Sequence, residues 1–376
     1  MSGIDFLSKL LDGAGVEWTI LGDSNFIEIA NNGRKPVKAS LRKPGKVPYY
    51  GANNVQDYVE GYTHEGEYVL IAEDGSASLE NYSIQYVSGK FWANNHVHVI
   101  RGTDSLNTRF LYHYLQIVNF IPFLSGGGRA KLTKGKMVEI QIPIPCPDNP
   151  EKSLAIQAEI VRILDTFAEL TAELTAELTA RKKQYNYYRD QLLTFEEGEV
   201  EWKPLGEVCD FRNGFAFKSS LFKDAGLPIV RITNIDGKRV DLSDVKYFSP
   251  DDYREDTSRY QVTKGDILIA MSGATTGKIG YFDAGTIAYQ NQRLGKFVPH
   301  NNALSNRYLF HYLLSVTEVI YRIAGGGAQP NLSSEKIMAD LKIPIPYPDS
   351  PAKSLAEQNR IAGILDKFDA LTNSIT

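Results

Sequence analysis

The chain carries one sequence pattern twice. Residues 142–157 read IPIPCPDNPEKSLAIQ and residues 343–358 read IPIPYPDSPAKSLAEQ, so twelve of sixteen positions are identical at an offset of 201. The match extends outward, because residues 109–116 (RFLYHYLQ) resemble residues 307–314 (RYLFHYLL). Solenoid repeats have periods of about 20–50 residues, so this much longer period predicts two copies of a whole domain. A chain of 376 residues is long enough for each copy to bury its own core.

Composition narrows the class of protein. The chain is 43% hydrophobic and 23% charged, as soluble globular proteins are. No run approaches the ~18 apolar residues of a membrane span, and MSGIDFLSKLLDG lacks the features of a signal peptide. These observations predict a cytoplasmic protein with no membrane partner. Cys146 and Cys209 are too few for a disulfide framework or a zinc site, and we predict no metal site.

Two β-rich segments share one layout. Residues 13–150 contain short β-type runs and turn signals, with a helix predicted over 107–118. Residues 199–345 repeat that layout, with a helix predicted near 305–322. His113 and His311 fall at equivalent places in the two copies, which favours a shared scaffold role over a ligand role.

Helical segments follow both copies. Residues 151–198 form a long predicted helix in which TAEL units place leucines along one ridge, and residues 346–376 hold a shorter second helix. Residues 1–12 resemble the end of the first helix, so we expect them to complete this helical spacer. The sequence thus predicts an α+β fold. It has two tandem mixed α/β domains, separated by two long antiparallel helices in a pseudo-twofold circular organisation.

The sequence contains no recognised catalytic motif. GATTGKIG at 273–280 resembles a phosphate loop, but Gly273 and Gly277 enclose three residues instead of four and Ile279 replaces the magnesium-binding Ser or Thr. Signatures of dinucleotide binding, zinc peptidases, serine hydrolases and amino-methyltransferases are also missing from the sequence. We therefore predict a non-catalytic protein that binds no cofactor itself.

Polar and basic side chains cluster where base recognition is expected. Asn and Gln pair with adenine and Arg with guanine, whereas Lys and Arg neutralise phosphates. The cluster PYYGANNV (48–55) aligns with PIVRITNI (228–235), and ANNH (93–96) aligns with QNQR (290–293). The predicted DNA-binding residues are Arg34, Lys35, Lys38, Arg42, Lys43, Asn53, Asn54, Asn94, Asn95, His96, Arg129, Lys131, Arg212, Lys218, Arg231, Asn234, Thr275, Lys278, Asn291, Gln292, Arg293, Gln329 and Asn331.

An alternative interpretation of these residues stays open. The amides can equally satisfy turns and strand ends, and the basic segment 31–46 can be a solvated loop rather than a phosphate-facing one. The net charge of −4 does not favour DNA binding by itself. The two aligned clusters match in position but differ in residue type, which favours two different ligand sequences.

The whole chain resembles the specificity (S) subunits of Type I restriction-modification enzymes. The resemblance rests on the two IPIP…KSLA-x-Q elements, on the TAEL repeat followed by RKKQYNYYRDQLL, and on NGFAFKSSLF and GDILIAMSGATTGKIG. It implies two target recognition domains that each read one half of an asymmetric, interrupted site in double-stranded DNA. It also implies two modification (methyltransferase) subunits and additional restriction (translocase and nuclease) subunits as partners. S-adenosylmethionine, ATP and magnesium would belong to those partners.

Two other classes of protein remain as rivals. A non-catalytic protein-binding scaffold would explain the helices and the acidic charge, but not the aligned amide and arginine clusters. A chain that acts with a nuclease of a different system is the other possibility, and no residue here supports it.

Overall fold

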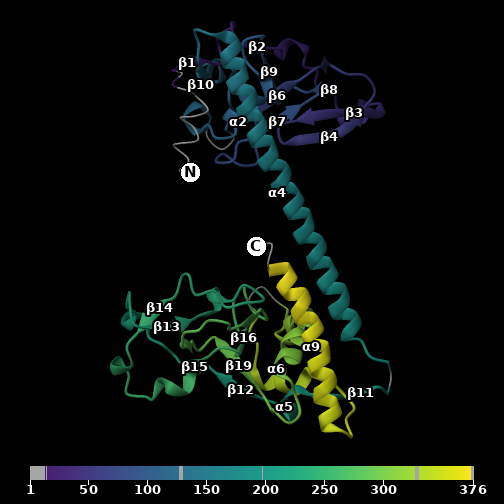
Figure 1. Cartoon of the computed structure of the whole chain (residues 1–376), viewed down its shortest axis with the longest axis vertical. Helices are drawn as coiled ribbons and strands as arrows, with labels where there is room; N and C mark the ends of the chain where they lie inside the picture. Colours follow the sequence, from purple (N-terminus) through teal and green to yellow (C-terminus); the bar gives the residue numbers. More distant parts are fainter. Residues whose placement is uncertain (1–12, 14, 127–129, 197, 327–329, 374–376) are drawn as a thin grey trace. The chain divides into compact units, whose positions relative to one another are not determined.

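The computed structural model describes residues 13, 15–126, 130–196, 198–326 and 330–373 (Figure 1). The chain divides into two compact units, Met1–Glu173 (unit 1) and Leu174–Thr376 (unit 2). Each unit has its own hydrophobic core and combines small sheets with helices, so the fold is mixed α/β as predicted. None of the helices in the described part is long and apolar enough to cross a membrane.

Unit 1 contains two four-stranded sheets and a two-stranded ribbon. The first sheet has the order β2 (Ile27–Ile29), β9 (Val97–Gly102), β6 (Tyr68–Ala72), β7 (Ile84–Val87). The second has the order β4 (Asn54–Val59), β3 (Pro44–Gly51), β8 (Lys90–Ala93), β5 (His64–Glu65). The ribbon pairs β1 (Val16–Ile20) with β10 (Gln141–Pro145), and the helices are α2 (Thr108–Leu115) and α3 (Lys134–Met137).

Unit 2 repeats this arrangement. Its sheets have the orders β12 (Cys209–Asn213), β19 (Leu294–Pro299), β16 (Ile267–Ala270), β17 (Ile279–Tyr281) and β14 (Lys246–Phe248), β13 (Leu227–Val230), β18 (Ala288–Gln290), β15 (Gln261–Val262). The ribbon pairs β11 (Val200–Pro204) with β20 (Lys342–Pro346). The helices are α5 (Leu205–Val208), α6 (Asn306–Ser315), α7 (Thr317–Ile323), α8 (Ser334–Asp340) and α9 (Pro351–Asn373).

The repeat extends to single residues. β3 and β8 run parallel with Tyr50 opposite Ala93, and β13 and β18 run parallel with Val230 opposite Gln290. Tyr50 and Val230 are both the third residue of their clusters PYYG and PIVR, and Ala93 and Gln290 are both the first residue of ANNH and QNQR. The structure therefore confirms the alignment of the two pairs of clusters. A register shift by one residue would have turned each side chain to the opposite face of its sheet.

The IPIP motif forms one strand of each ribbon. Ile142 and Ile144 are buried in the core of unit 1, as Ile343 and Ile345 are in unit 2. The prolines alternate with them because successive side chains of a strand point to opposite faces. Opposite each central proline lies a half-exposed tryptophan, so both ribbons present the same aromatic surface. These pairs are Trp18 with Pro143 and Trp202 with Pro344.

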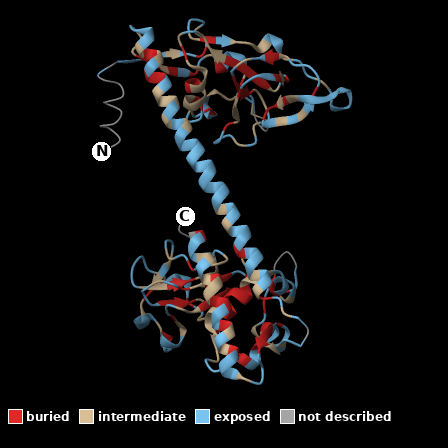
Figure 2. Ribbon diagram, turned by 45° about the vertical axis from the view of Figure 1, so that its right-hand side comes forward, coloured by how far each residue is buried: buried red, intermediate tan, exposed pale blue. Residues whose placement is uncertain are grey.

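The long helix α4 spans Pro150–Leu192. Every residue from Thr166 to Glu177 is exposed, as the pale blue middle of the helix in Figure 2 shows. The helix ends at Leu192 rather than at 198, because Leu193 is buried in the core of unit 2 and Phe195 packs against that core. Phe368 of α9 stacks on Tyr188 of α4 with ring centroids 4.7 Å apart, so the end of α4 and α9 pack side by side. The predicted helix over residues 1–12 lies outside the described residues.

Two predicted helices differ in extent from the observed ones. The helix predicted over 107–118 is α2, whose start is capped by the Asn107 side chain, which accepts from the backbone of Arg109 and Phe110. The helix predicted near 305–322 is interrupted at Val316, where φ is −112° and ψ is 21°, and becomes α6 and α7. The interruption places α7 beside the loop that follows β16, a feature that the repeat alone does not predict.

Candidate nucleic-acid interface

In unit 1 the predicted polar residues gather where several strands end. The backbone amide of Asn94 donates to Tyr50 O (3.2 Å), and that of Glu73 donates to His96 O (2.8 Å). The amide of Leu132 in turn donates to Glu73 O (2.7 Å). The loops after β3, β6 and β8 therefore meet the segment before α3 in one cluster, here called loop cluster 1.

Unit 2 builds the same cluster with other side chains. The amide of Asn291 donates to Val230 O (3.0 Å), and that of Met271 donates to Arg293 O (2.9 Å). The amide of Leu332 donates to Met271 O (2.8 Å). These three bonds are the counterparts of those in unit 1, and they define loop cluster 2.

Several predicted amides hold loop cluster 1 together. The side chain of Asn53 donates to Gly75 O (2.7 Å) and accepts from Ala77 N (2.8 Å). Asn54 accepts from the amide of Val55 (2.8 Å). Asn94 is only 3% exposed and accepts from His96 N (2.8 Å). These contacts fit the alternative interpretation that the amides satisfy turns.

Asn234 has a similar role in unit 2. It is 4% exposed, accepts from the amide of Arg231 (2.9 Å) and donates to Asp244 O (2.8 Å). A buried amide with both ends bonded cannot reach a base edge without losing those bonds. Asn234 therefore supports its loop through both ends of its amide, and Asn94 supports its loop through its oxygen; base contact by either residue stays a prediction.

Some predicted cations of unit 1 are paired internally. Arg34 contacts Glu73 at 2.6 Å and Lys131 contacts the same carboxylate at 3.0 Å. Burial opposes ionisation of Glu73, but the hydrogen bonds from Arg34 and Lys131 outweigh it and lower the pKa of its carboxyl group. His96 contacts Asp74 at 2.6 Å, and Arg42 contacts Asp57 at 3.4 Å while covering the Tyr49 ring.

The remaining predicted cations and amides are available to a ligand. These residues are exposed, and their side chains have no partner among the described residues. They are Lys35, Lys38, Lys43 and Asn95 in unit 1, and Arg212, Lys218, Lys278, Gln292, Arg293 and Asn331 in unit 2. Asn291 is half-buried and accepts from the amide of Arg293 at 3.4 Å. Arg129 and Gln329 lie outside the described residues.

Loop cluster 2 also contains buried polar atoms that lack a protein partner. They are Arg231 Nε, Ser272 Oγ, Thr275 Oγ1 and Gln290 Oε1, four of the five such side-chain atoms found in the described part of the chain. Most buried polar atoms in proteins are hydrogen-bonded, so a group of exceptions needs an explanation. Their position at the ends of β13, β16 and β18 favours a site that exchanges water for a polar ligand. Sequence patterns did not single out Ser272.

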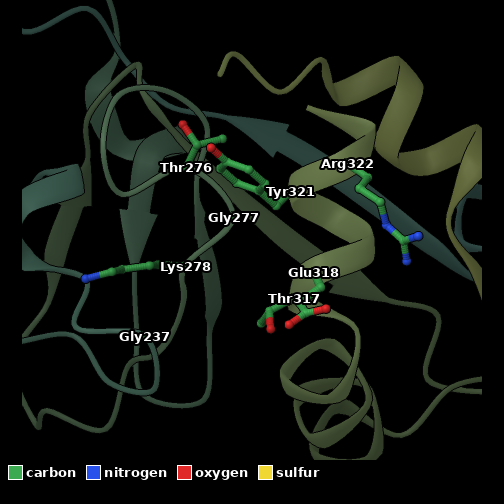
Figure 3. Close-up of a pocket in the computed structure, with 8 residues that line it drawn as sticks. All are labelled: Gly237, Thr276, Gly277, Lys278, Thr317, Glu318, Tyr321 and Arg322. Carbon is green, nitrogen blue, oxygen red and sulfur yellow. The ribbon is translucent and has the colours of Figure 1, made fainter. Parts of the chain in front are cut away.

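The GATTGKIG segment borders a cavity of about 680 Å³ between the loop after β16 and α7 (Figure 3). The hydroxyl of Thr276 donates to Gly273 O and lies 3.0 Å from Pro330 O, so it stabilises the loop. Figure 3 shows Lys278 and Arg322 on different sides of the cavity. The absence of a nucleotide-binding phosphate loop at this segment stays a prediction.

A buried Ser–Gln pair fixes the helical part to each unit. Gln157 of α4 accepts from Asn107 N (2.8 Å), and its amide group donates to Ser153 Oγ (3.1 Å). In unit 2, Gln358 of α9 accepts from Ser305 N (2.8 Å) and donates to Ser354 (3.0 Å). The KSLA-x-Q element is therefore a joint between domain and helix. The four side chains Ser153, Gln157, Ser354 and Gln358 are nearly fully buried.

An ionic clamp reinforces each joint. In unit 1, Asp165 of α4 accepts from Arg109 Nε (3.0 Å) and lies 2.7 Å from His113 Nε2. In unit 2, Asp366 of α9 accepts from Arg307 Nε (2.9 Å) and lies 2.7 Å from His311 Nε2. The scaffold role predicted for His113 and His311 is confirmed. Tyr185 of α4 adds a contact in unit 2, with its hydroxyl 2.9 Å from His311 Nδ1.

The unit 2 clamp predicts a loss of stability in acid. Burial alone would raise the pKa of Asp366, but His311 and Arg307 outweigh it and lower the pKa to about 2. A carboxylate with a lowered pKa stabilises the fold above its unfolded pKa and loses that contribution as the pH falls through the folded value. The free energy of unfolding of unit 2 should therefore fall between about pH 4 and about pH 2.

Asp366→Asn should lower the free energy of unfolding at neutral pH by about 1 kcal/mol, since the half-exposed carboxylate is partly screened by water. It should also flatten the acid dependence. Denaturant unfolding across this pH range measures both effects. Glu255→Gln is the control, because it removes an exposed carboxylate of unit 2 that has no ion pair among the described residues. An unchanged acid profile in Asp366→Asn would contradict the assignment.

Comparison with known proteins agrees with this architecture. Residues 16–181 and 197–376 both match the family described as the Type I restriction modification DNA specificity domain. The chain belongs to this family. The specificity subunit thus carries two tandem target recognition domains, one in each unit, and the resemblance seen in the sequence is confirmed.

Individual relatives extend over nearly the whole specificity subunit. A Haemophilus influenzae protein assigned as a type I restriction enzyme specificity subunit is 47% identical and covers 99% of this chain and 92% of its own length. The EcoR124I/EcoR124II specificity subunit of Escherichia coli is 35% identical, with coverages of 100% and 92%. The S subunit crystal structure from M. genitalium has a TM-score of 0.69 at 16% identity, covers 97% and 92% of the two chains, and shows the shared fold.

Proposed function

We propose that this specificity subunit directs a Type I complex to DNA by reading two different half-sites, one with each unit. The observation that carries the proposal is the contrast between the two loop clusters. Their backbone hydrogen bonds correspond one to one, whereas the side chains at equivalent positions differ. Asn94, Asn95 and His96 stand in unit 1 where Asn291, Gln292 and Arg293 stand in unit 2. One scaffold with two sets of contact residues suits an asymmetric bipartite site.

The available side chains suggest how each unit reads DNA. In unit 2, Arg293 and Gln292 are exposed side by side, and these residue types pair with guanine and adenine in the major groove. Arg212, Lys218 and Lys278 would neutralise phosphates around them. In unit 1, Asn95 would contact bases, and the unpaired lysines of the 31–46 segment would contact phosphates. Phosphate contacts position the protein on the DNA, and base contacts specify the sequence.

The helix α4 would set the separation between the half-sites. It passes from unit 1 into unit 2 without a break, and an α-helix of 43 residues is about 65 Å long. The two clamps attach unit 1 to α4 and unit 2 to α9 and α4. A DNA base pair rises by about 3.4 Å, so the helix length translates into a number of unread base pairs.

The partners would be two modification subunits and the restriction subunits, which would supply catalysis with S-adenosylmethionine, ATP and magnesium. Two surfaces occur in both units and suit a partner present in two copies: the ribbon tryptophans Trp18 and Trp202, and the outer faces of α4 and α9. Of the ridge residues expected from the sequence, Phe167 is 63% exposed, whereas Phe368 is covered by Tyr188. With a net charge of −4 the chain alone would bind DNA weakly.

Arg293→Ala tests this function directly. Loss of a bidentate arginine costs about 1–3 kcal/mol of discrimination at one base pair, or about 5- to 150-fold. The complex with modification subunits should therefore methylate sites with any base at one position of one half-site. Mapping methylated adenines in a genome that expresses the variant measures this directly.

Lys264→Ala is the control for Arg293→Ala, because Lys264 is exposed at the opposite end of β16, before the strand begins. A methylated motif that stays identical in Arg293→Ala would count against base reading by loop cluster 2. Failure of the wild-type complex to bind any bipartite site would instead support the rival, a protein-binding scaffold.

A further inference from the structure

The two units differ at one equivalent place beside the parallel strand pair. In unit 1 the backbone amide of Lys35 donates to Ala93 O (2.9 Å), and in unit 2 that of Phe215 donates to Gln290 O (3.0 Å). The strand registers make Trp92 the counterpart of Tyr289 and Tyr49 the counterpart of Ile229. They also make Val59 the counterpart of Phe248. Val59 pairs with Val47 and Phe248 pairs with Leu227, and these partners lie two residues before Tyr49 and Ile229 in their strands.

Unit 2 fills this place with a closed aromatic cluster. Phe217, Ile229, Phe248 and Tyr289 are buried there, and Phe215 packs against them. The rings of Phe248 and Tyr289 are 4.9 Å apart, and those of Phe217 and Phe248 are 4.5 Å apart. In unit 2 this position is thus part of a packed aromatic cluster, which is a purely structural use of the position.

Unit 1 leaves a cavity of about 310 Å³ at the same place. The counterparts Lys35, Tyr49, Val59 and Trp92 line it, together with Val37, Leu41, Arg42, Lys43 and Glu60. The smaller Val59 stands where unit 2 has Phe248, and a lysine stands where it has Phe215. The volume is at the lower end of the range for small-molecule pockets, about 300–1,000 Å³.

The wall of the cavity is held in place before any ligand arrives. The indole N–H of Trp92 donates to Lys35 O (2.7 Å), and Tyr49 Oη accepts from Val37 N (3.0 Å). Arg42 donates to Val37 O (3.1 Å) and lies over the Tyr49 ring at 4.1 Å. These bonds fix the segment that carries Leu41, whose apolar side chain is 70% exposed.

The rim of the cavity is positive. Among the lining residues, Lys35, Arg42 and Lys43 are positive and Glu60 is negative, and Arg42 is paired with Asp57. The ammonium groups of Lys35 and Lys43 are exposed and unpaired in the described structure. An apolar, partly aromatic interior beneath unpaired cations complements a flat aromatic group joined to an anion. A nucleotide has this chemistry, with the base for the interior and the phosphate for the lysines.

We propose that this cavity binds one nucleotide of the DNA with its base taken out of the helical stack. The proposal rests on the proposed function and adds a binding site that only unit 1 possesses. The base would contact Trp92, Val37 and Leu41, and its flanking phosphates would contact Lys35 and Lys43. Enzymes that bind unstacked bases use aromatic and apolar side chains in the same manner.

The test places 2-aminopurine, which fluoresces strongly when unstacked, at each position in and around the half-site of unit 1. In the complex with modification subunits, one position other than the methylated adenine should become several-fold brighter. Val59→Phe copies the residue of unit 2 and should return that position to the fluorescence of the duplex. Leu79→Phe, which enlarges an exposed side chain that is not among the cavity's lining residues, should leave it bright.

A second variant protects the test against misfolding of Val59→Phe. Lys43→Gln changes only an exposed, unpaired side chain, and it should weaken DNA binding and lower the slope of log K against log salt by about one. Titration of ATP or dAMP against Trp92 fluorescence checks for a free nucleotide as occupant. Saturable quenching without any bright position in DNA would overturn the proposal.

The proposal and the proposed function fail in different ways. If the complex still methylates a bipartite site while no second position brightens, the cavity is not a base pocket and half-site reading stands. The same conclusion follows if the bright position is unaffected by Val59→Phe. If no bipartite site is methylated at all, the proposed function itself is wrong.

Discussion

A specificity subunit lengthened by one TAEL unit should recognise the same two half-sites at a larger separation. Four added helical residues extend α4 by about 6 Å, or one to two base pairs, and rotate the C-terminal part of the helix by about 40°. The insertion belongs within Thr166–Glu177, where every residue is exposed, so it disturbs no packing. A misplacement of even 1 Å can cost about 100-fold in rate, so methylation at the original spacing should fall by at least about 100-fold.

A DNA library with the natural half-sites and every spacer length measures this change. The control variant replaces residues 171–174 with four other helix-forming residues, which keeps the length of α4 and should keep the spacer. Methylation at the original spacing with undiminished efficiency would show that α4 does not set the distance. A change in either half-site sequence would show that the insertion alters the recognition domains themselves.

Much of the fold is predictable from the repeated sequence. The repeat predicts two like domains, and the aligned clusters occupy equivalent strand positions, with Tyr50 opposite Ala93 in unit 1 and Val230 opposite Gln290 in unit 2. The reason is physical, because alternate side chains of a paired strand must face the same core in both units. The KSLA-x-Q element is recognisable as important from sequence, but its role as a joint depends on Gln157 reaching Asn107.

The candidate site is harder to predict than the fold. A sequence cannot tell that Asn53 bonds to the loop after β6 or that Arg34 bonds to Glu73, because these partners come from distant segments. Residue type alone does not decide this, because Arg34 is bonded inside unit 1 whereas Arg293 and Gln292 are exposed. The cavity of unit 1 also escapes prediction, since it depends on Val59 and Phe248 being counterparts across two strands.

The central claim is that each unit reads its own half-site. Exchange of residues 13–150 for the matching segment of another family member tests it, provided that the donor segment supplies counterparts of Asn107, Arg109 and His113. These residues bond to Gln157 and Asp165 of α4, so their presence keeps the joint intact. The unexchanged chain expressed with the same modification subunits is the matched control.

Sequencing of methylated adenines across a genome that expresses the exchanged chain with modification subunits is the most direct measurement. Independent reading by the two units predicts a new bipartite motif in which one half-site is that of the donor. The other half-site and the number of unread base pairs should remain those of the parent. A motif in which both half-sites change, or in which neither does, would contradict independent reading.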